Sequence, residues 1–175
     1  FFFQAEDGIR DSSVTGVQDV CSSDLVKKNK VNQQHGLFAN KSFTVGEFMI
    51  SFDATKIVDT PNYLTVQVSE FKHIHLFPEY LQYINHSCQP NVLFNTTTMQ
   101  LECVSDIQIG DELCFFYPAT EWKMAQPFVC NCGQPNCVGL IQGAADTPNE
   151  VLNKYKLTDF IKSLAAQYKN LLMLF

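Results

Sequence analysis

The sequence predicts one domain that is mostly β, with short helices and a helical C-terminus. Between residues 36 and 117, short apolar runs alternate with polar residues at the period of two that is typical of strands. In residues 149–155 and 158–174 the apolar residues instead recur at helical spacing. Hydrophobic residues make up 46% of the 175 positions, which is enough for a folded core.

The expected strands share alternating apolar residues and flanking turn residues. They are residues 36–39, 44–52, 63–68 and 71–76, followed by the hairpin 91–94 and 99–104. Pro78 is expected to begin a short helical turn that runs to residue 84. Residues 113–117 are almost all apolar, so we expect a strand that is buried on both faces and ends at Pro118. Thr158 or Asp159 is expected to cap the last helix.

Residues 1–25 differ from the rest of the chain. They show neither period and are similar to translated sequencing-adapter fragments, so we expect a non-native or disordered segment and leave it out of the fold. A genuine disordered tail is the alternative. This segment holds five of the 18 acidic residues and one of the 12 basic residues, so the rest carries a net charge of −2 rather than −6.

The composition disfavours two classes of partner. Residues 26–175 contain no arginine, whereas nucleic-acid-binding surfaces are usually rich in it, so no direct nucleic-acid binding is expected. No run of about 18 apolar residues occurs, so no membrane span is expected. The seven cysteines lack the spacing of a small secreted scaffold, and no secretory signal is visible, which indicates an intracellular protein, nuclear or cytoplasmic.

Four cysteines lie in two separate groups. Cys88 belongs to the sequence Asn-His-Ser-Cys-Gln-Pro-Asn at 85–91, and Cys130, Cys132 and Cys137 form a Cys-x-Cys-x4-Cys pattern. Neither group fills a tetrahedral zinc shell, but together they supply the four thiolates of a closed structural site. Disulfides or buried cysteines without metal are alternatives, and so is a site in which His86 is a ligand.

The cysteines and histidines in the predicted strands are not expected to bind metal. Cys103 and Cys114 lie in predicted strands and are expected in the core. His73 and His75 share one face of the strand 71–76 and lack an evident third metal ligand, so we expect them to face solvent.

Three segments, in this order, resemble motifs of SET-domain protein-lysine N-methyltransferases with a post-SET zinc motif. Residues 85–91 are similar to the family's Asn-His-Ser-Cys-x-Pro-Asn, residues 110–117 to Gly-Glu-Glu-Leu-x-Phe-Asp-Tyr, and residues 130–137 with Gly139 to the post-SET cysteine run. Residues 34–39 match the glycine-containing start of the domain more weakly. No cysteine-rich module precedes the core, so the chain resembles small stand-alone SET proteins.

The resemblance implies a SET-domain fold of several small sheets, in which the Asn-His segment and the last strand cross in a knot-like arrangement. It implies a SET domain at 26–118, a post-SET zinc segment at 119–143 and a C-terminal helical extension at 144–175. S-adenosylmethionine is expected on one side of the crossing, and the substrate lysine is expected to enter from the other side through a narrow channel.

The resemblance also assigns roles to residues. Tyr117 matches the catalytic tyrosine that orients the amine; without the motif, a core tyrosine with a satisfied hydroxyl would be expected. Phe115, on the same strand face, matches an aromatic switch, and phenylalanine there favours di- or trimethylation. Tyr63 is a candidate second channel tyrosine or a surface residue, and Tyr83 lines the cofactor pocket or the core. The expected cofactor-binding residues are Gln34, His35, Gly36, Tyr83, Asn85, His86 and Tyr117.

The predicted function is transfer of a methyl group from S-adenosylmethionine to a lysine of a protein or peptide, with one structural Zn2+. This chemistry needs a neutral amine, and because free lysine has a pKa of about 10.4, a buried channel must favour the neutral form. Gln34 stands where the family has glycine, which favours the alternative of a catalytically degenerate SET-like binding or scaffold protein. A zinc ribbon for nucleic acid is disfavoured by the missing arginines and would leave the Tyr117 motif unexplained.

Overall fold

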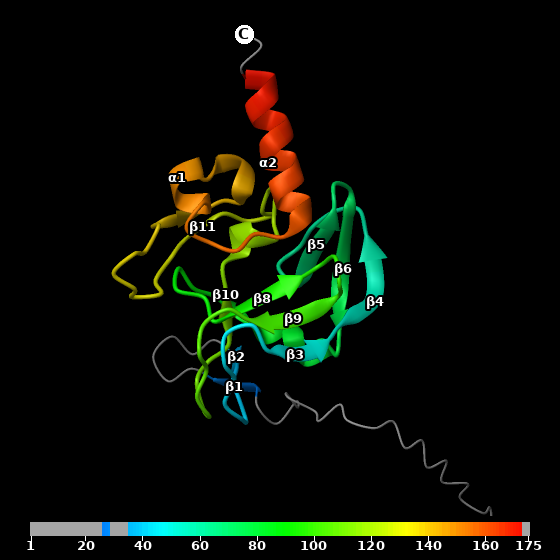
Figure 1. Cartoon of the computed structure of the whole chain (residues 1–175). Helices are drawn as coiled ribbons and strands as arrows, with labels where there is room; N and C mark the ends of the chain where they lie inside the picture. The colour runs from blue at the N-terminus through cyan, green and yellow to red at the C-terminus, as the bar shows by residue number, and fades with distance from the viewer. Residues whose placement is uncertain (1–25, 29–34, 173–175) are drawn as a thin grey trace, which may run out of the picture.

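The computed structural model describes residues 26–28 and 35–172, and Figure 1 shows their arrangement. Residues 1–25 and Gln34, on which two of the expectations fall, lie outside the described residues. The strands are β1 (Val26–Lys28), β2 (His35–Leu37), β3 (Phe48–Ser51), β4 (Asp53–Val58), β5 (Thr65–Ser69), β6 (Lys72–Phe77), β7 (Asn85–His86), β8 (Val92–Asn95), β9 (Gln100–Cys103), β10 (Cys114–Phe115), β11 (Phe128–Val129) and β12 (Leu140–Ile141).

The helical elements are short except for the last. They are the 3-10 turns η2 (Glu79–Tyr83), η3 (Tyr117–Ala119) and η4 (Ala144–Asp146) and the helices α1 (Asn149–Leu152) and α2 (Asp159–Leu172). The predicted class, mostly β with short helices and a helical C-terminus, is confirmed. Among the described residues, no helix combines the length and the hydropathy that a transmembrane span requires.

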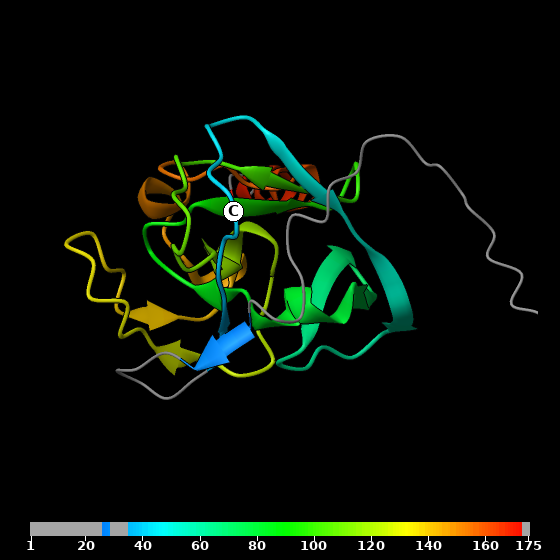
Figure 2. The ribbon, with the colours of Figure 1, turned by 90° about the horizontal axis from the view of Figure 1, so that it is seen from below.

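The described strands form five small sheets. Two sheets have three antiparallel strands, in the orders β3–β9–β8 and β4–β6–β5. The others are the antiparallel pairs β1–β2 and β11–β12 and the parallel pair β7–β10. The yellow loop between β11 and β12 projects from one side of the molecule in two perpendicular views (Figures 1 and 2). Helix α2 extends away from the sheets in Figure 1.

The pair β7–β10 brings together segments that are distant in the sequence. Asn85 is the register partner of Cys114, and His86 is the register partner of Phe115. Just before β10, the N–H of Leu113 donates to the carbonyl of residue 37 over 2.7 Å, so β2 joins the same place. The start of the domain, the Asn-His step and the last strand therefore meet at one point.

The C-terminal extension packs on the core. Its buried residues Leu152 and Ile161 form a cluster with Phe116 and Ala119, and each of these four side chains is 3% exposed or less. Helix α2 begins after Thr158, whose hydroxyl accepts the N–H of Ile161 over 3.4 Å. Of the two expected caps, Thr158 is therefore the one that the structure uses.

Two local expectations are wrong. Strand β10 covers only Cys114 and Phe115, because the N–H of Tyr117 donates to the side chain of His86 and the chain turns into η3 at Tyr117. Cys114 and Tyr117 are half-buried rather than buried on both faces. His73, expected at the surface, is only 4% exposed, because the segment that contains Trp122 lies beside that face of β6.

Candidate functional site

Tyr117 lies in an aromatic wall at the end of the last strand. Its ring centroid is 4.6 Å from that of Phe115, 5.1 Å from His86 and 6.0 Å from Phe128. Burial among these rings raises the pKa of the Tyr117 phenol well above its usual value. The hydroxyl of Tyr117 is therefore held neutral at any physiological pH, and the surroundings disfavour a charge.

His86 connects this wall to the cysteines. Its Nδ1 accepts the N–H of Tyr117 over 3.3 Å, and its Nε2 lies 3.4 Å from the Sγ of Cys88. Burial lowers the pKa of His86 to about 4, so the ring is neutral at physiological pH. Because Nδ1 is the acceptor, the single proton belongs on Nε2 and points at the sulfur.

Asn85 fixes the meeting point of three segments. Its side-chain nitrogen donates to the carbonyl of His35 over 2.9 Å and to the Oε1 of Glu112 over 2.8 Å. A Cβ added to Gly36 would lie 2.5 Å from that same carboxylate oxygen, so glycine is required at this position for the close approach of Glu112. The ring of Tyr83 lies 5.7 Å from that of His35 and completes this side.

The structure therefore brings together most of the residues expected to bind the cofactor. They are linked by contacts of β2 with η2, of Asn85 with His35 and of His86 with Tyr117, and the six residues are His35, Gly36, Tyr83, Asn85, His86 and Tyr117. Tyr63 is placed differently. It lies in the turn before β5, its side chain is 82% exposed, and it is not among the described rings that pack on Tyr117.

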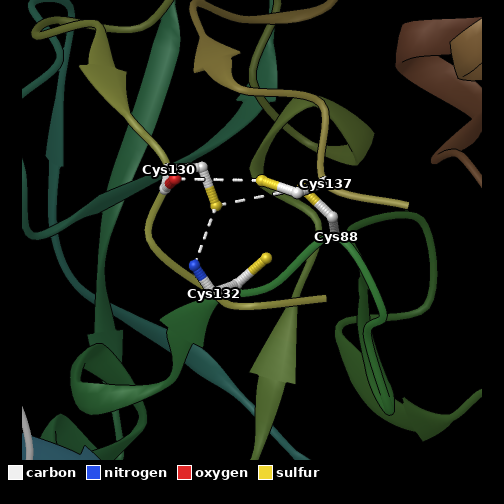
Figure 3. A group of neighbouring side chains, drawn as sticks. All are labelled: Cys88, Cys130, Cys132 and Cys137. Carbon is white, nitrogen blue, oxygen red and sulfur yellow. Dashed lines mark hydrogen bonds between the residues drawn. The ribbon is translucent and has the colours of Figure 1, made fainter. Parts of the chain in front are cut away.

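The four cysteines of the two motifs meet in one cluster, shown in Figure 3. Their sulfur atoms all lie within 4.8 Å of one another, and the Sγ atoms of Cys88 and Cys130 are 3.9 Å apart. Tetrahedral zinc with Zn–S bonds of about 2.3 Å requires sulfurs about 3.8 Å apart, so the donor set and its spacing fit a four-thiolate metal site. The cysteines are free rather than disulfide-bonded, and His86 contacts the cluster without replacing a cysteine.

The thiols of this cluster differ in how readily they ionise. Burial raises the pKa of Cys88 to about 11 and also raises the pKa of Cys130. Burial opposes ionisation of Cys132 too, but hydrogen bonds from neighbouring backbone N–H groups and thiols outweigh it and lower the pKa of Cys132 to about 7. One thiolate therefore forms easily near neutral pH, and a bound cation would favour ionisation of the others.

The sequence did not indicate the groups that hold the cluster in place. The carbonyl of Cys88 accepts hydrogen bonds from the Nδ2 of Asn136 over 2.7 Å and from the hydroxyl of Tyr155 over 2.9 Å. The ring of Tyr155 stacks on Phe116, with centroids 3.7 Å apart and planes 8° apart. The C-terminal extension thereby contacts both the cysteine cluster and the residue before Tyr117. Asn136 could have been suspected because it lies within the cysteine motif, whereas no pattern marked Tyr155.

A buried carboxyl group follows Tyr117 and was also missed. Glu121 is 7% exposed and accepts the backbone N–H of Gln67 over 2.8 Å, while the side-chain oxygen of Gln67 accepts the N–H of Trp122 over 2.8 Å. These reciprocal bonds tie β5 to the segment after the catalytic candidate. Burial raises the pKa of Glu121 to about 7. A lone glutamate between threonine and tryptophan carries no motif that would have revealed it.

Comparison with known proteins agrees with this geometry. Residues 34–118 match the family model described as SET domain, and this part of the chain is a SET domain. Over 106 residues the chain is 44% identical to "Methyltransferase flvH" of Aspergillus flavus, a match that covers 59% of each protein. Over 131 residues it is 33% identical to "Histone-lysine N-methyltransferase, H3 lysine-36 specific" of Gibberella zeae, covering 71% of this chain and 14% of that protein. The chain thus spans 59% or less of the length of these two relatives.

Solved structures support the fold. The chain is similar to a crystal structure of KRYPTONITE in complex with mCHG DNA and SAH, with a TM-score of 0.52 and 16% sequence identity, over 66% of this chain and 28% of that one. A second KRYPTONITE structure, in complex with mCHH DNA, an H3(1-15) peptide and SAH, gives a TM-score of 0.50 with the same identity and coverage. At this identity the likeness concerns the fold alone.

Proposed function

We propose that the chain transfers a methyl group from S-adenosylmethionine to the side-chain nitrogen of a lysine in a protein or peptide. The observation that carries this proposal is the parallel pairing of β7 with β10, in which Asn85 is the partner of Cys114 and His86 is the partner of Phe115, while His86 also accepts the N–H of Tyr117. The names of the two relatives, a methyltransferase and a histone-lysine methyltransferase, support the same chemistry. A module that only binds zinc would not require the pairing of β7 with β10 or the rings around Tyr117.

The cofactor would be held on the β2 side of the crossing. His35, Gly36 and Asn85 would contact it there; Asn85 holds this side together by donating to the carbonyl of His35 and to Glu112, whose carboxylate occupies the space that a Cβ at Gly36 would need. S-adenosylmethionine supplies the methyl group on a sulfonium, and the lone pair of the lysine nitrogen takes this methyl as the carbon–sulfur bond breaks. Fixed alignment of the two reactants supplies much of the rate.

The aromatic wall would prepare the lysine. A lysine amine among Tyr117, Phe115 and Phe128 loses its hydration, which disfavours the ammonium and lowers the pKa of that amine. Tyr117 would accept or donate one hydrogen bond and orient the lone pair without becoming charged, in line with its raised pKa. The proton that the nitrogen releases would leave to solvent.

Two further residue assignments belong to this proposal. Phe115 would leave room beside the amine, because it carries no hydroxyl to hold a water there, and would so permit di- or trimethylation. Tyr63 would be either a second channel tyrosine or a surface residue, the two alternatives that the sequence left open. Its 82% exposure favours the surface alternative, and the experiment below separates the two.

The cysteine cluster would hold one structural Zn2+ through Cys88, Cys130, Cys132 and Cys137. Four sulfur donors in a closed shell leave no position for substrate, so the metal would contribute folding energy rather than Lewis-acid chemistry. It would fix the post-SET segment 119–143 against the Asn-His step.

The partner would be a protein or peptide that carries the target lysine. The name of one relative, a histone-lysine N-methyltransferase, supports a lysine-bearing protein such as a histone as substrate. Direct nucleic-acid binding is not part of the proposal, since residues 26–175 contain no arginine. An intracellular place of action, nuclear or cytoplasmic, would suit such a substrate.

The test is transfer of labelled methyl from S-adenosylmethionine to proteins of an extract, using the full chain with zinc. Tyr117→Phe is expected to lose the label on protein, whereas Tyr63→Phe, which removes a hydroxyl from an exposed turn, is expected to keep it if Tyr63 is a surface residue. Loss in both variants would make Tyr63 a channel residue. Cofactor binding without transfer by the unmodified chain would instead indicate the degenerate binding or scaffold protein.

A further inference from the structure

A second cavity lies away from the Tyr117 wall and the cysteine cluster. It has a volume of about 330 Å³ and is bounded by the β5–β6 turn, the segment after Glu121 and helix α2. It shares no lining residue with the ring contacts of Tyr117 or with the four cysteines. A ligand in this cavity would therefore not touch the rings around Tyr117 or the four cysteines.

The walls of this cavity are aromatic. Trp122 and Tyr168 line it with ring centroids 4.8 Å apart and planes inclined by 49°. Phe71, at the β5–β6 turn, lines it too and is 71% exposed. The faces of aromatic rings attract cations as well as aliphatic chains, and tryptophan does so most strongly.

The charge around the cavity is predominantly negative. Asp59 and Glu70 line it against one base, Lys123. Among the residues that the structure describes, neither carboxylate forms an ion pair; both ion pairs lie elsewhere, at Lys156 and Lys162. The site therefore presents two negative charges that an incoming cation would partly neutralise.

A buried histidine adds an unused hydrogen-bonding atom. His73 lines the cavity and is 4% exposed, and its Nδ1 has no hydrogen-bond partner among the described residues. Burial lowers the pKa of His73, so the ring is neutral at physiological pH, and an Nδ1 without a proton is an acceptor. A buried polar atom without a partner is costly, and a ligand N–H would relieve that cost.

We propose that this cavity binds a basic side chain, lysine or arginine, of a partner protein. The aliphatic stem of such a side chain suits the rings of Trp122, Tyr168 and Phe71, and its charged end suits Asp59 and Glu70. Its N–H groups can donate to the Nδ1 of His73 in the tautomer whose proton lies on Nε2. A neutral side chain of the same length would contact the aromatic rings but would not interact with the two carboxylates.

Trp122 makes the test direct, because it is the single tryptophan of the chain and lines the cavity. Its fluorescence is measured while N-acetyl-lysine amide, N-acetyl-arginine amide or N-acetyl-norleucine amide is titrated at constant ionic strength. The full chain is used without S-adenosylmethionine, so failure of methyl transfer does not affect the result. We expect a saturable change with the lysine derivative, the arginine derivative or both, and none with the norleucine derivative over the same range.

Variants separate the charge from the walls. The double variant Asp59→Asn/Glu70→Gln is expected to weaken binding of the cation by about threefold, and Lys123→Gln to strengthen it by about twofold, as exposed charge pairs do. The control Glu79→Gln/Glu150→Gln removes two carboxylates that lie outside the cavity. It is expected to leave the affinity for the lysine and arginine derivatives unchanged. Equal responses to the lysine and norleucine derivatives, no response to either cation, or equal weakening by the control would overturn the proposal.

Discussion

Replacing Glu121 with glutamine is expected to remove one pH dependence from the free energy of unfolding. Burial raises the pKa of Glu121 from 4.5 to about 7 in the folded chain. Between these two values the folded chain holds a proton that the unfolded chain has lost. The stabilisation from this proton is therefore fully present below the unfolded pKa and is lost as the pH rises through about 7.

The magnitude follows from the size of the shift. One pKa unit corresponds to about 1.4 kcal/mol, so the rise from 4.5 to about 7 corresponds to about 3 kcal/mol in the free energy of unfolding. Glutamine retains an oxygen that accepts the N–H of Gln67 but does not titrate. The stability of Glu121→Gln minus that of the unmodified chain should rise by about 1.4 kcal/mol per pH unit from pH 5 to 7 and then level off.

The assay is urea denaturation of both proteins at a series of pH values with zinc present. Burial lowers the pKa of His86 to about 4, which makes stability rise with pH as the unfolded histidine deprotonates, but this occurs in both proteins and cancels in the difference. Glu150→Gln, at an exposed position, is the control and should give a flat difference. A flat difference for Glu121→Gln as well would refute the buried, protonated carboxyl.

Three other predictions concern the cysteines, the extension and the wall. Cys137→Ser is expected to lose the bound Zn2+ and to have a lower melting temperature, whereas Cys103→Ser, outside the cluster, is expected to keep the metal. The zinc content of the two purified variants is measured by metal analysis. Equal zinc content in both would contradict the four-cysteine site. Tyr155→Phe should lower the free energy of unfolding in urea by only about 1 kcal/mol, because Asn136 still donates to the carbonyl of Cys88. Tyr155→Ala should lower it by about 3 kcal/mol, because the stack on Phe116 is lost too. Equal losses in the two variants would contradict the role of the stack. Phe115→Tyr is expected to shift the product toward monomethyl-lysine in mass spectra of labelled protein, and an unchanged product distribution would count against Phe115 as the switch.

The sequence predicted the parts of the fold that local patterns determine. Alternation located the hairpin that became β8 and β9, and helical spacing located α2 with its cap at Thr158. The motif spacing predicted that Cys88 would meet three cysteines more than 40 residues away, and the cluster confirms it. These successes rest on a period or on a motif whose chemistry requires proximity.

The remaining features depend on tertiary contacts that no local pattern carries. His73 is buried because a segment some 50 residues later and helix α2 lie beside β6, and the strand alternation alone gave no sign of this cover. Tyr155 forms a hydrogen bond with Cys88, which lies 67 positions earlier in the chain. Glu121 forms one with Gln67, which lies 54 positions earlier. Contacts between residues this far apart follow from the tertiary arrangement of the segments, and no local sequence pattern predicts them.

A cofactor site at the crossing is tested by calorimetric titration of the full, zinc-loaded chain with S-adenosylmethionine, beside Asn85→Ala and Asn95→Ala. Asn85 donates to both His35 and Glu112 at the crossing, whereas the hydrogen bonds of Asn95 to described residues all lie within its hairpin. We expect one cofactor to bind per chain, about tenfold more weakly to Asn85→Ala and with unchanged affinity to Asn95→Ala, with thermal unfolding showing that both variants are folded. No binding by the unmodified chain, or the same affinity in all three proteins, would contradict a cofactor site at the crossing.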